Sequence, residues 1–489
     1  MKKINSQNRI YLIYKKKKLE ITKINRNKKN LIAKKNNFLT SNLLFSIFTI
    51  IFLSISLSNE KKLQTLRNLE NDYSEISITI KGGSEQNIIS SSASVVNKLL
   101  EVSINGAIQD SSDIKISGLE ENKEVEVSMK FSSPIHSLEK LFFNLENIIR
   151  VDLSNFDTSN LEIMNLTFSG CKNLESINFG ENNIYKINSM NHLFQNCMKL
   201  TSLDLSNFDT SKVSKMVYLF YNCNSLKYLN IPKFNTSSVK DMNSMFFKCS
   251  ELTSLNLQNF DTSSVTTMYQ MFYGCSQLLS LDLSNFSTLN VKNMEGVFRG
   301  CSKLEYINVS SFDTSSVEKM KEMFYDCKSI TSLDLSNFNT QKLNEMESMF
   351  RGCNNLLSLD LSNFKTSLVT SFLFLFNDCY KLTSLDISSF NTIKCTNMKN
   401  MFSNCESLKS IDLSSFNTEI VSNMQYMFSG CKNILSLDLS NFNTAKAPKI
   451  DYMFNNCESL IFLNLNSFNQ IGSIDNTFFW NFHSIKILY

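Results

Sequence analysis

The sequence is poor in the residues from which enzymes and metal sites are usually built. Its 489 residues include only three histidines, three prolines and one tryptophan. So few histidines leave little material for acid–base or metal chemistry, and so few prolines argue against a linker-rich or disordered chain. The sequence also lacks a glycine-rich phosphate loop, a Ser/His/Asp or Cys/His constellation and any Cys-x-x-Cys pair. These absences predict a protein that is not an enzyme and uses no cofactor.

The net charge of +4 is distributed very unevenly along the chain. Residues 1–37 form a basic N-terminal segment with 13 Lys or Arg and a single acid, Glu20. Its balance of +12 leaves −8 for the rest of the chain. A mildly acidic main body does not attract phosphate backbones, so no nucleic-acid partner is predicted.

Residues 38–58, FLTSNLLFSIFTIIFLSISLS, form the one long apolar run. About 20 apolar residues span a bilayer as a helix. The run is interpreted either as a signal anchor, with residues 1–37 held in the cytosol, or as a cleavable signal peptide ending near Ser56 or Ser58. A buried core helix is the third alternative. The first two predict a cell-surface or secreted protein, and a retained segment makes it a single-pass membrane protein with a cytosolic N-terminus.

Two short regions separate this hydrophobic segment from the rest of the chain. Residues 59–75 are polar and charged and predict a stalk, in which RNLEND (67–72) loosely resembles an Arg-x-Leu export signal of some parasites. Residues 76–132 contain stretches that alternate apolar and polar side chains, as strands do. We expect a small β-rich unit there that covers the open end of a repeat array.

A repeat of 26 residues fills the remainder of the chain. Counting the unit that starts at Leu145, about 13 units lie between residues 145 and 482, within a predicted solenoid of residues 133–482 and before a tail of residues 483–489. The period is marked by cysteines at positions 171, 197, 223, 249, 275, 301, 327, 353, 379, 405, 431 and 457.

Each unit has the same order of apolar and polar positions, counted here from its cysteine. Leucines at +3, +6 and +8 alternate with polar residues and predict a short strand. Phe follows at +11 and Thr at +13, where Thr can cap a turn or a helix start. Apolar residues at +16, +19, +22, +23 and +26 have helical spacing. The sequence therefore predicts an α/β solenoid of the leucine-rich-repeat type, with a parallel strand, a turn and a short helix in each unit.

The repeat closely resembles that of a known family. LTSLDLSNFDTSKVSKMVYLFYNC (Leu200–Cys223) is similar to the 26-residue bacterial-surface-protein repeat of BspA-like leucine-rich-repeat proteins. The resemblance rests on the Leu-x-x-Leu-x-Leu run, SNFDTS, the Met and Phe positions and the closing Cys. It implies a solenoid with a role in adhesion or partner contact, and it supplies no catalytic residues. The chain lacks the hydrophobic C-terminal tail of many members, so an anchor would have to be residues 38–58.

The cysteine column has three interpretations. Neighbouring ladder positions lie close enough for disulfides, and an oxidising compartment would permit them. A metal array would need His or Cys-x-x-Cys pairs. Cys395, the one cysteine off the ladder, stands at +16 in a column of valines, which favours small buried thiols. The Met and Phe columns are likewise interpreted as core rather than as a ligand groove. The predicted core includes Cys197, Cys223, Cys249, Cys275, Phe208, Phe234, Met216 and Met242.

The variable positions +5, +7 and +9 should point outward from the strand and carry any binding function. At +7, five consecutive carboxylates are expected to repel one another, to raise each other's pKa and to form at best a weak cation ladder. Aromatic residues at +5 beside an asparagine at +7 are better contact material. The cation candidates are Asp334, Asp360, Asp386, Asp412 and Asp438, and the contact candidates are Tyr228, Asn230, Tyr306 and Asn308, with Phe462 and Asn464 in a third unit.

Taken together, the residues predict a non-enzymatic surface protein that recognises a protein or glycan ligand. A self-associating coat scaffold is the nearest alternative, and an exported effector is a further one. Four Asn-x-Ser/Thr triplets, headed by Asn165, Asn235, Asn285 and Asn308, could carry glycans in the secretory route, although four are close to chance in so Asn- and Ser-rich a chain.

Overall fold

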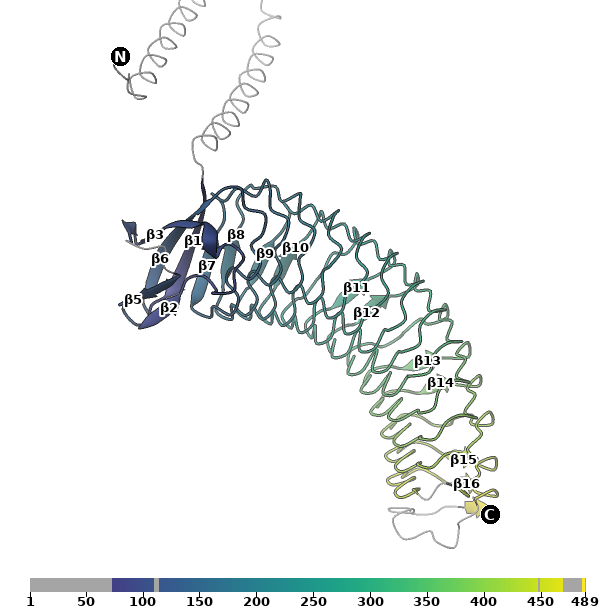
Figure 1. The fold of residues 1–489 in the computed structure, drawn as a ribbon. Helices are drawn as coiled ribbons and strands as arrows, with labels where there is room; N and C mark the ends of the chain where they lie inside the picture. The colour runs from purple at the N-terminus through teal and green to yellow at the C-terminus, as the bar shows by residue number, and fades with distance from the viewer. Residues whose placement is uncertain (1–72, 110–113, 447–448, 469–485, 489) are drawn as a thin grey trace, which may run out of the picture. The chain divides into compact units, whose positions relative to one another are not determined.

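The computed structural model describes residues 73–109, 114–446, 449–468 and 486–488 (Figure 1). The chain divides into two units, residues 1–72 and 73–489. The basic segment 1–37, the hydrophobic segment 38–58, the export-like stretch 67–72 and nearly all of the stalk lie outside the described residues. Among the helices of the described part, none combines the length and the apolar character needed to cross a bilayer.

The described chain opens with a small β-rich cap. Its first strand begins at Tyr73, three residues before the predicted start of the β-rich unit at residue 76, because residues 73–75 already pair with residues 130–132. The strand alternates half-buried and buried side chains over its whole length, as a strand covering a core on one face does. The cap elements are β1 (Tyr73–Lys81), β2 (Glu85–Asn87), the 3₁₀-helix η1 (Val96–Lys98), β3 (Leu99–Ile104), β4 (Ala107–Ile108), β5 (Lys115–Ser117) and β6 (Glu124–Ser132).

The cap joins the solenoid through one mixed sheet. Strand β1 pairs antiparallel with β6 on one side and antiparallel with β7 (Ile148–Asp152) on the other. Strand β7 in turn pairs in parallel with β8 (Ser176–Asn178), the strand of the next coil. The sheet has six strands in the order β4-β3-β6-β1-β7-β8, and Figure 1 shows β6, β1, β7 and β8 side by side where the cap meets the coils. The first coil therefore has its strand edge covered by hydrogen bonds as well as by packing.

The solenoid continues as short parallel strands of three residues, which most of its coils contain. In four of them, which begin at Ser202, Ser280, Ser358 and Ser436, the outer two residues are exposed and the middle one is buried. Between residues 202 and 464 the strands form neighbouring pairs that recur every 78 residues, and every third coil follows the same path without a described strand. The strand at residues 486–488 adds to the last pair as a third strand. The strands are β9 (Ser202–Asp204), β10 (Tyr228–Asn230), β11 (Ser280–Asp282), β12 (Tyr306–Asn308), β13 (Ser358–Asp360), β14 (Ser384–Asp386), β15 (Ser436–Asp438), β16 (Phe462–Asn464) and β17 (Lys486–Leu488).

The parallel solenoid and its 26-residue spacing are confirmed, with about 12 coils closed by the ladder cysteines rather than 13. The short helix predicted in each unit is wrong. The second half of each coil is a chain of turns in which Cys197 N–H donates to the Phe194 carbonyl three residues back (3.2 Å). Phe194 N–H instead donates across to the Leu219 carbonyl of the next coil (3.0 Å). An α-helix would direct both donors four residues back within its own turn.

Left-handed residues explain why this segment cannot be a helix. In every coil that the structure describes at these positions, the residues at +21 and +25 have positive φ, as Tyr218 (55°) and Asn222 (61°) do. A residue in this region reverses the right-handed path and ends helical hydrogen bonding. Position +25 is Asn, Gly or Asp in all coils except at Lys248, which matches the residues that adopt positive φ at least cost.

The core consists of side chains repeated once in every coil. All of the predicted core residues are buried. The phenylalanines at +23 form an unbroken stack from Phe142 to Phe454, with neighbouring ring centroids 5.4–5.9 Å apart. The threonines at +13 tie coils together, since Thr210 Oγ1 donates to the Asn235 carbonyl (2.9 Å) and accepts Asn235 N–H (2.8 Å). Each coil thus presents the same apolar and polar partners to the next.

Candidate recognition surfaces

Positions +5, +7 and +9 form one exposed surface along the coils, named here the strand face. Tyr228 and Tyr306 lie on it, each with 59% of its surface exposed. The asparagine that follows each of them is held in place: Asn230 Nδ2 donates to Asp204 Oδ1 of the preceding coil (3.1 Å), and Asn308 Oδ1 accepts a hydrogen bond from the backbone N–H of Ser310 (3.1 Å). The predicted contact residues therefore combine an exposed ring with an oriented amide.

A set of exposed leucines beside this face was missed by the sequence reasoning. Leu279, Leu357 and Leu435 stand at +4, and each is 47–49% exposed. The three leucines are 78 residues apart, as are Tyr228 and Tyr306, whereas Ile461, 60% exposed at the same position, departs from this spacing. The signal that could have revealed them is a three-coil period laid over the 26-residue repeat.

The aspartates at +7 form the predicted column, and hydrogen bonds lower the pKa of three of them. The hydroxyl (2.7 Å) and backbone N–H (3.1 Å) of Ser336 donate to Asp334 Oδ1 and lower the pKa of Asp334. The backbone N–H of Ser362 lowers the pKa of Asp360 in the same way, and Asp412 follows this pattern. The expectation that these neighbouring carboxylates raise each other's pKa is wrong for these three, because hydrogen bonds to the charged form favour it.

The cation ladder stays a prediction. Asp360 and Asp386 face each other directly in the β13–β14 pair. Within the described residues no group of three His, Cys, Asp or Glu side chains is arranged to hold a metal ion. One oxygen of Asp386, like that of Asp334, already accepts hydrogen bonds from the serine two residues on. A cation there would bind to carboxylates that are already part of local turns.

The ladder cysteines are free, buried thiols that also form hydrogen bonds. Cys223 Sγ donates to the carbonyl oxygen of Phe194 on the preceding coil (3.0 Å), and the same contact recurs at every ladder position. Burial raises the pKa of the Cys223 thiol to about 12. Leu145 occupies the first position of the ladder. No repeat precedes it, so no phenylalanine carbonyl is present to accept a hydrogen bond from a thiol at this position.

A second surface feature was also missed: side chains at +24 and +21 stack from coil to coil. Tyr221, Phe247 and Tyr273 stack with ring centroids 4.4 and 4.5 Å apart. Arg299 continues the stack, with its guanidinium carbon 5.1 Å from the Tyr273 ring and 4.4 Å from the Tyr325 ring. Arg299 also pairs with Glu322, and Arg351 follows on the other side of Tyr325. The rings cover one another's faces, so the stack holds coils together more than it offers a flat binding platform.

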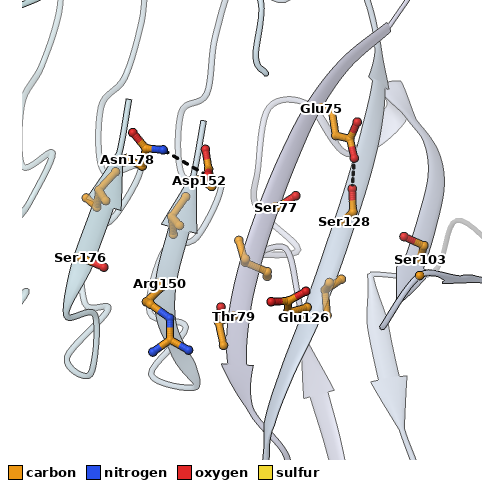
Figure 2. Close-up of a pocket in the computed structure, with 15 residues that line it drawn as sticks. Glu75, Ser77, Thr79, Ser103, Glu126, Ser128, Arg150, Asp152, Ser176 and Asn178 are labelled. Carbon is orange, nitrogen blue, oxygen red and sulfur yellow. Dashed lines mark hydrogen bonds between the residues drawn. The ribbon is translucent and has the colours of Figure 1, made fainter. Parts of the chain in front are cut away.

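The junction of cap and coils contains a polar depression of about 580 Å³ (Figure 2). It lies on the open face of the mixed sheet. Two of its groups are linked across strands, since Asn178 Nδ2 of β8 donates to Asp152 Oδ2 of β7 (3.2 Å). The labelled side chains around it are Glu75, Ser77, Thr79, Ser103, Glu126, Ser128, Arg150, Asp152, Ser176 and Asn178.

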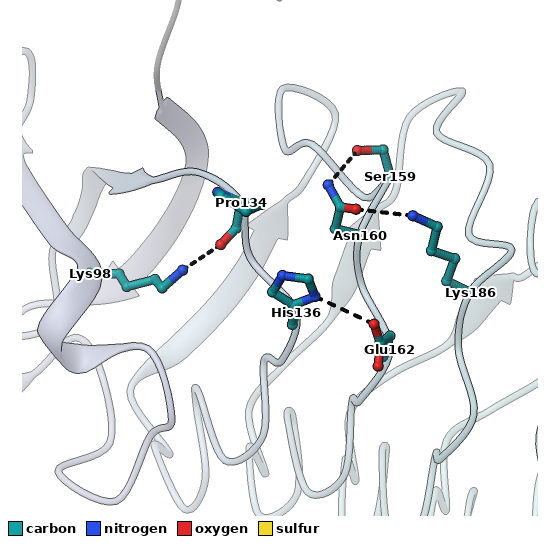
Figure 3. Close-up of polar contacts among 7 residues, drawn as sticks. All are labelled: Lys98, Pro134, His136, Ser159, Asn160, Glu162 and Lys186. Carbon is teal, nitrogen blue, oxygen red and sulfur yellow. Dashed lines mark hydrogen bonds and ion pairs between the residues drawn. The ribbon is translucent and has the colours of Figure 1, made fainter.

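Other polar contacts near the cap are structural (Figure 3). Lys98 of η1 donates to the carbonyl of Pro134, which links the cap to the start of the solenoid. His136 Nδ1 lies 3.4 Å from Glu162 Oε1 on the next coil, and both side chains are about half exposed. Exposed pairs of this kind contribute little to stability. One of the three histidines is therefore accounted for as a contact between coils.

In one of the four glycosylation triplets, the asparagine side chain already makes hydrogen bonds to the protein. Asn285 Nδ2 lies 2.8–3.3 Å from three backbone carbonyls of the preceding coil, those of Leu257, Gln258 and Phe260. An amide nitrogen in such a position cannot carry a glycan without losing these bonds.

The fold defines a β-solenoid repeat protein, built on a mixed-sheet cap. The chain belongs to the family described as "Mycoplasma protein of unknown function, DUF285", whose model matches residues 136–254, 188–305, 276–384 and 370–484. No curated protein sequence matches the chain. Among solved structures it is similar to "Crystal structure of TLR13-ssRNA13 complex", with 16% identity over 72% of this chain and 79% of that chain. The TM-score is 0.14, and the likeness supports no further statement about this chain.

Proposed function

We propose that this chain is a non-enzymatic recognition protein of the BspA-like type that binds a protein or glycan partner through its strand face. The observation that supports this most directly is the pair Tyr228 and Tyr306, which break the Ser-x-Asp pattern of that face and are each 59% exposed. Aromatic side chains beside oriented amides contribute contact area at low entropic cost. Leu279, 48% exposed, stands one residue before Ser280, which pairs with Tyr306, and adds apolar surface there.

The test replaces both tyrosines by serine, the residue that most other coils carry at +5. Because the rings are exposed and serine is native to the column, stability should change by no more than about 0.5 kcal/mol. Binding of the full-length chain to an array of extracellular proteins, glycosylated and deglycosylated, should weaken at least about tenfold, about 1.4 kcal/mol. Ser358→Ala on the same face is the control. Unchanged binding in the double variant would refute the assignment, and concentration-dependent self-association without any array partner would favour the coat scaffold instead.

Delivery to the cell surface or the exterior is part of the proposal, and it rests on the basic segment 1–37 followed by the apolar run 38–58. We expect the mature chain, purified from the membrane and secreted fractions of its own cells, to begin either at its original N-terminus or close to Asn59. N-terminal sequencing distinguishes the anchored form from the cleaved one. Recovery of the intact chain from the cytosol alone would contradict both forms.

A further inference from the structure

The depression at the junction of cap and coils has the dimensions of a ligand site. Its volume of about 580 Å³ lies within the range of small-molecule pockets, roughly 300–1,000 Å³. Strands β1 and β6 of the cap and β7 and β8 of the first coils supply its sides, so it forms where the cap joins the solenoid (Figure 2). Sites of this kind are common where units join.

Four hydroxyl groups in the depression make no side-chain hydrogen bond to any described residue. They belong to Ser77, Thr79, Ser103 and Ser176, which come from three different strands of the sheet. The first three residues lie in the cap and Ser176 lies in the coils. A hydroxyl can donate one hydrogen bond and accept two. The site therefore presents a set of groups that can each either donate to a ligand or accept from it.

The planar side chains of the depression are already held in place. Asp152 accepts the backbone N–H of Ser154 (2.8 Å) as well as Asn178 Nδ2, and Asn178 Oδ1 accepts the backbone N–H of Gly180 (2.9 Å). These bonds use only part of the capacity of each group, because a carboxylate has about four acceptor positions and an amide nitrogen two donors. Groups that are ordered before binding reduce the entropy lost on binding.

The balance of charge indicates what kind of ligand fits. Glu75, Glu126 and Asp152 bring three carboxylates to the depression against one guanidinium, and Arg150 already pairs with Glu124. An anionic ligand would meet net repulsion. A neutral ligand with many hydroxyl groups would both donate to the carboxylates and accept from the amide, the guanidinium and the free hydroxyls.

We propose that this depression binds a short, neutral saccharide of two or three units. The site is separate from Tyr228 and Tyr306, so it goes beyond the proposed function and does not depend on it. The sugar hydroxyls pair with Asp152, Asn178 and the four free hydroxyl groups, and the open face of the paired strands β1 and β7 borders the site.

The test uses the full-length chain and isothermal titration with maltotriose, cellotriose and triacetylchitotriose, alongside anionic 3′-sialyllactose and cationic chitotriose. At least one neutral trisaccharide is expected to bind. Ser176→Trp should fill the depression and weaken that binding at least about tenfold, about 1.4 kcal/mol. Ser358→Trp, at the same +5 position of a distant coil, is the matched control and should bind normally.

A second variant keeps the test decisive if the tryptophan disturbs folding. Ser77→Ala combined with Thr79→Ala removes two free hydroxyls without adding volume, and it should also weaken binding while the thermal midpoint stays unchanged. The Tyr228→Ser, Tyr306→Ser variant should bind the saccharide normally, which separates this site, at the first coils of the strand face, from the surface around the two tyrosines. Absence of binding by every neutral probe, binding of only the anionic or only the cationic probe, or equal loss in Ser358→Trp would overturn the proposal.

Discussion

Replacing Phe246 by alanine is expected to lower the free energy of unfolding by about 3–5 kcal/mol. The ring is fully buried and stacks between Phe220 and Phe272, with both centroid distances 5.5 Å. Removal leaves a cavity that the coils cannot close, because their spacing is set by inter-coil hydrogen bonds on both sides of the ring. Urea unfolding followed by circular dichroism measures the loss.

Because Phe246 lies within the array, its replacement should also change how the chain unfolds. Each coil contacts only its neighbours, so a weak interface in the middle of the array separates two more stable halves. Hydrogen exchange should then show protection falling first in the coils that flank residue 246. Tyr306→Ala removes a comparable ring from an exposed position and should cost no more than about 0.5 kcal/mol. Equal losses from the two variants would contradict the stacked-core explanation.

Mild alkali is expected to unfold the solenoid cooperatively between about pH 9 and pH 10. Burial raises the pKa of the thiols of Cys223, Cys275 and Cys457 to about 12, whereas an unfolded thiol ionises near about pH 8.5. Above that pH the unfolded chain has fewer bound protons than the folded chain. Stability is therefore complete below the unfolded pKa and falls as the pH rises toward the folded pKa, by about 1.4 kcal/mol per pH unit for each thiol.

The number of thiols makes this effect large. All 13 cysteines are free and buried, and 12 of them stand on the ladder, so the slope is the sum of many equal contributions. Thiolate absorbance should stay absent until circular dichroism reports unfolding, while the same chain in concentrated guanidinium titrates normally. Cys395→Val, which restores the residue typical of its column, should fold and reduce the slope by one thiol. A gradual thiolate titration in a chain that remains folded would refute the prediction.

The regular features of this fold could be predicted because they repeat without insertion. The residue types of Leu203 and Phe208 return every 26 residues, and this regular spacing predicts both the repeat length and the parallel strands. The helix was wrong because a chain of turns buries every third or fourth residue as a helix does. The distinguishing signal is the residue before each ladder cysteine: Asn222 and Gly274 are both types that accept positive φ.

The candidate sites were less accessible to sequence reasoning, for physical reasons. The exposure of Tyr228 follows from alternation along a strand. The lowered pKa of Asp334 depends on where the N–H of Ser336 points, which is a matter of backbone conformation. The junction depression depends on β1 pairing with both β6 and β7, and hydrogen bonding between segments far apart in the sequence cannot be read from local patterns.

The three-coil recurrence of Leu279, Leu357 and Leu435 has a consequence for how such arrays change in length. Three coils advance the solenoid by about 14 Å at ordinary strand spacing. Duplication or loss of a 78-residue block keeps the buried core positions in register and moves the exposed leucines in whole steps of that length. Insertion of a single coil also folds in register but shifts those leucines out of phase with the ones before it. A block of three coils therefore sets the spacing of the exposed leucines, and duplication of whole blocks lengthens the array while that spacing is kept.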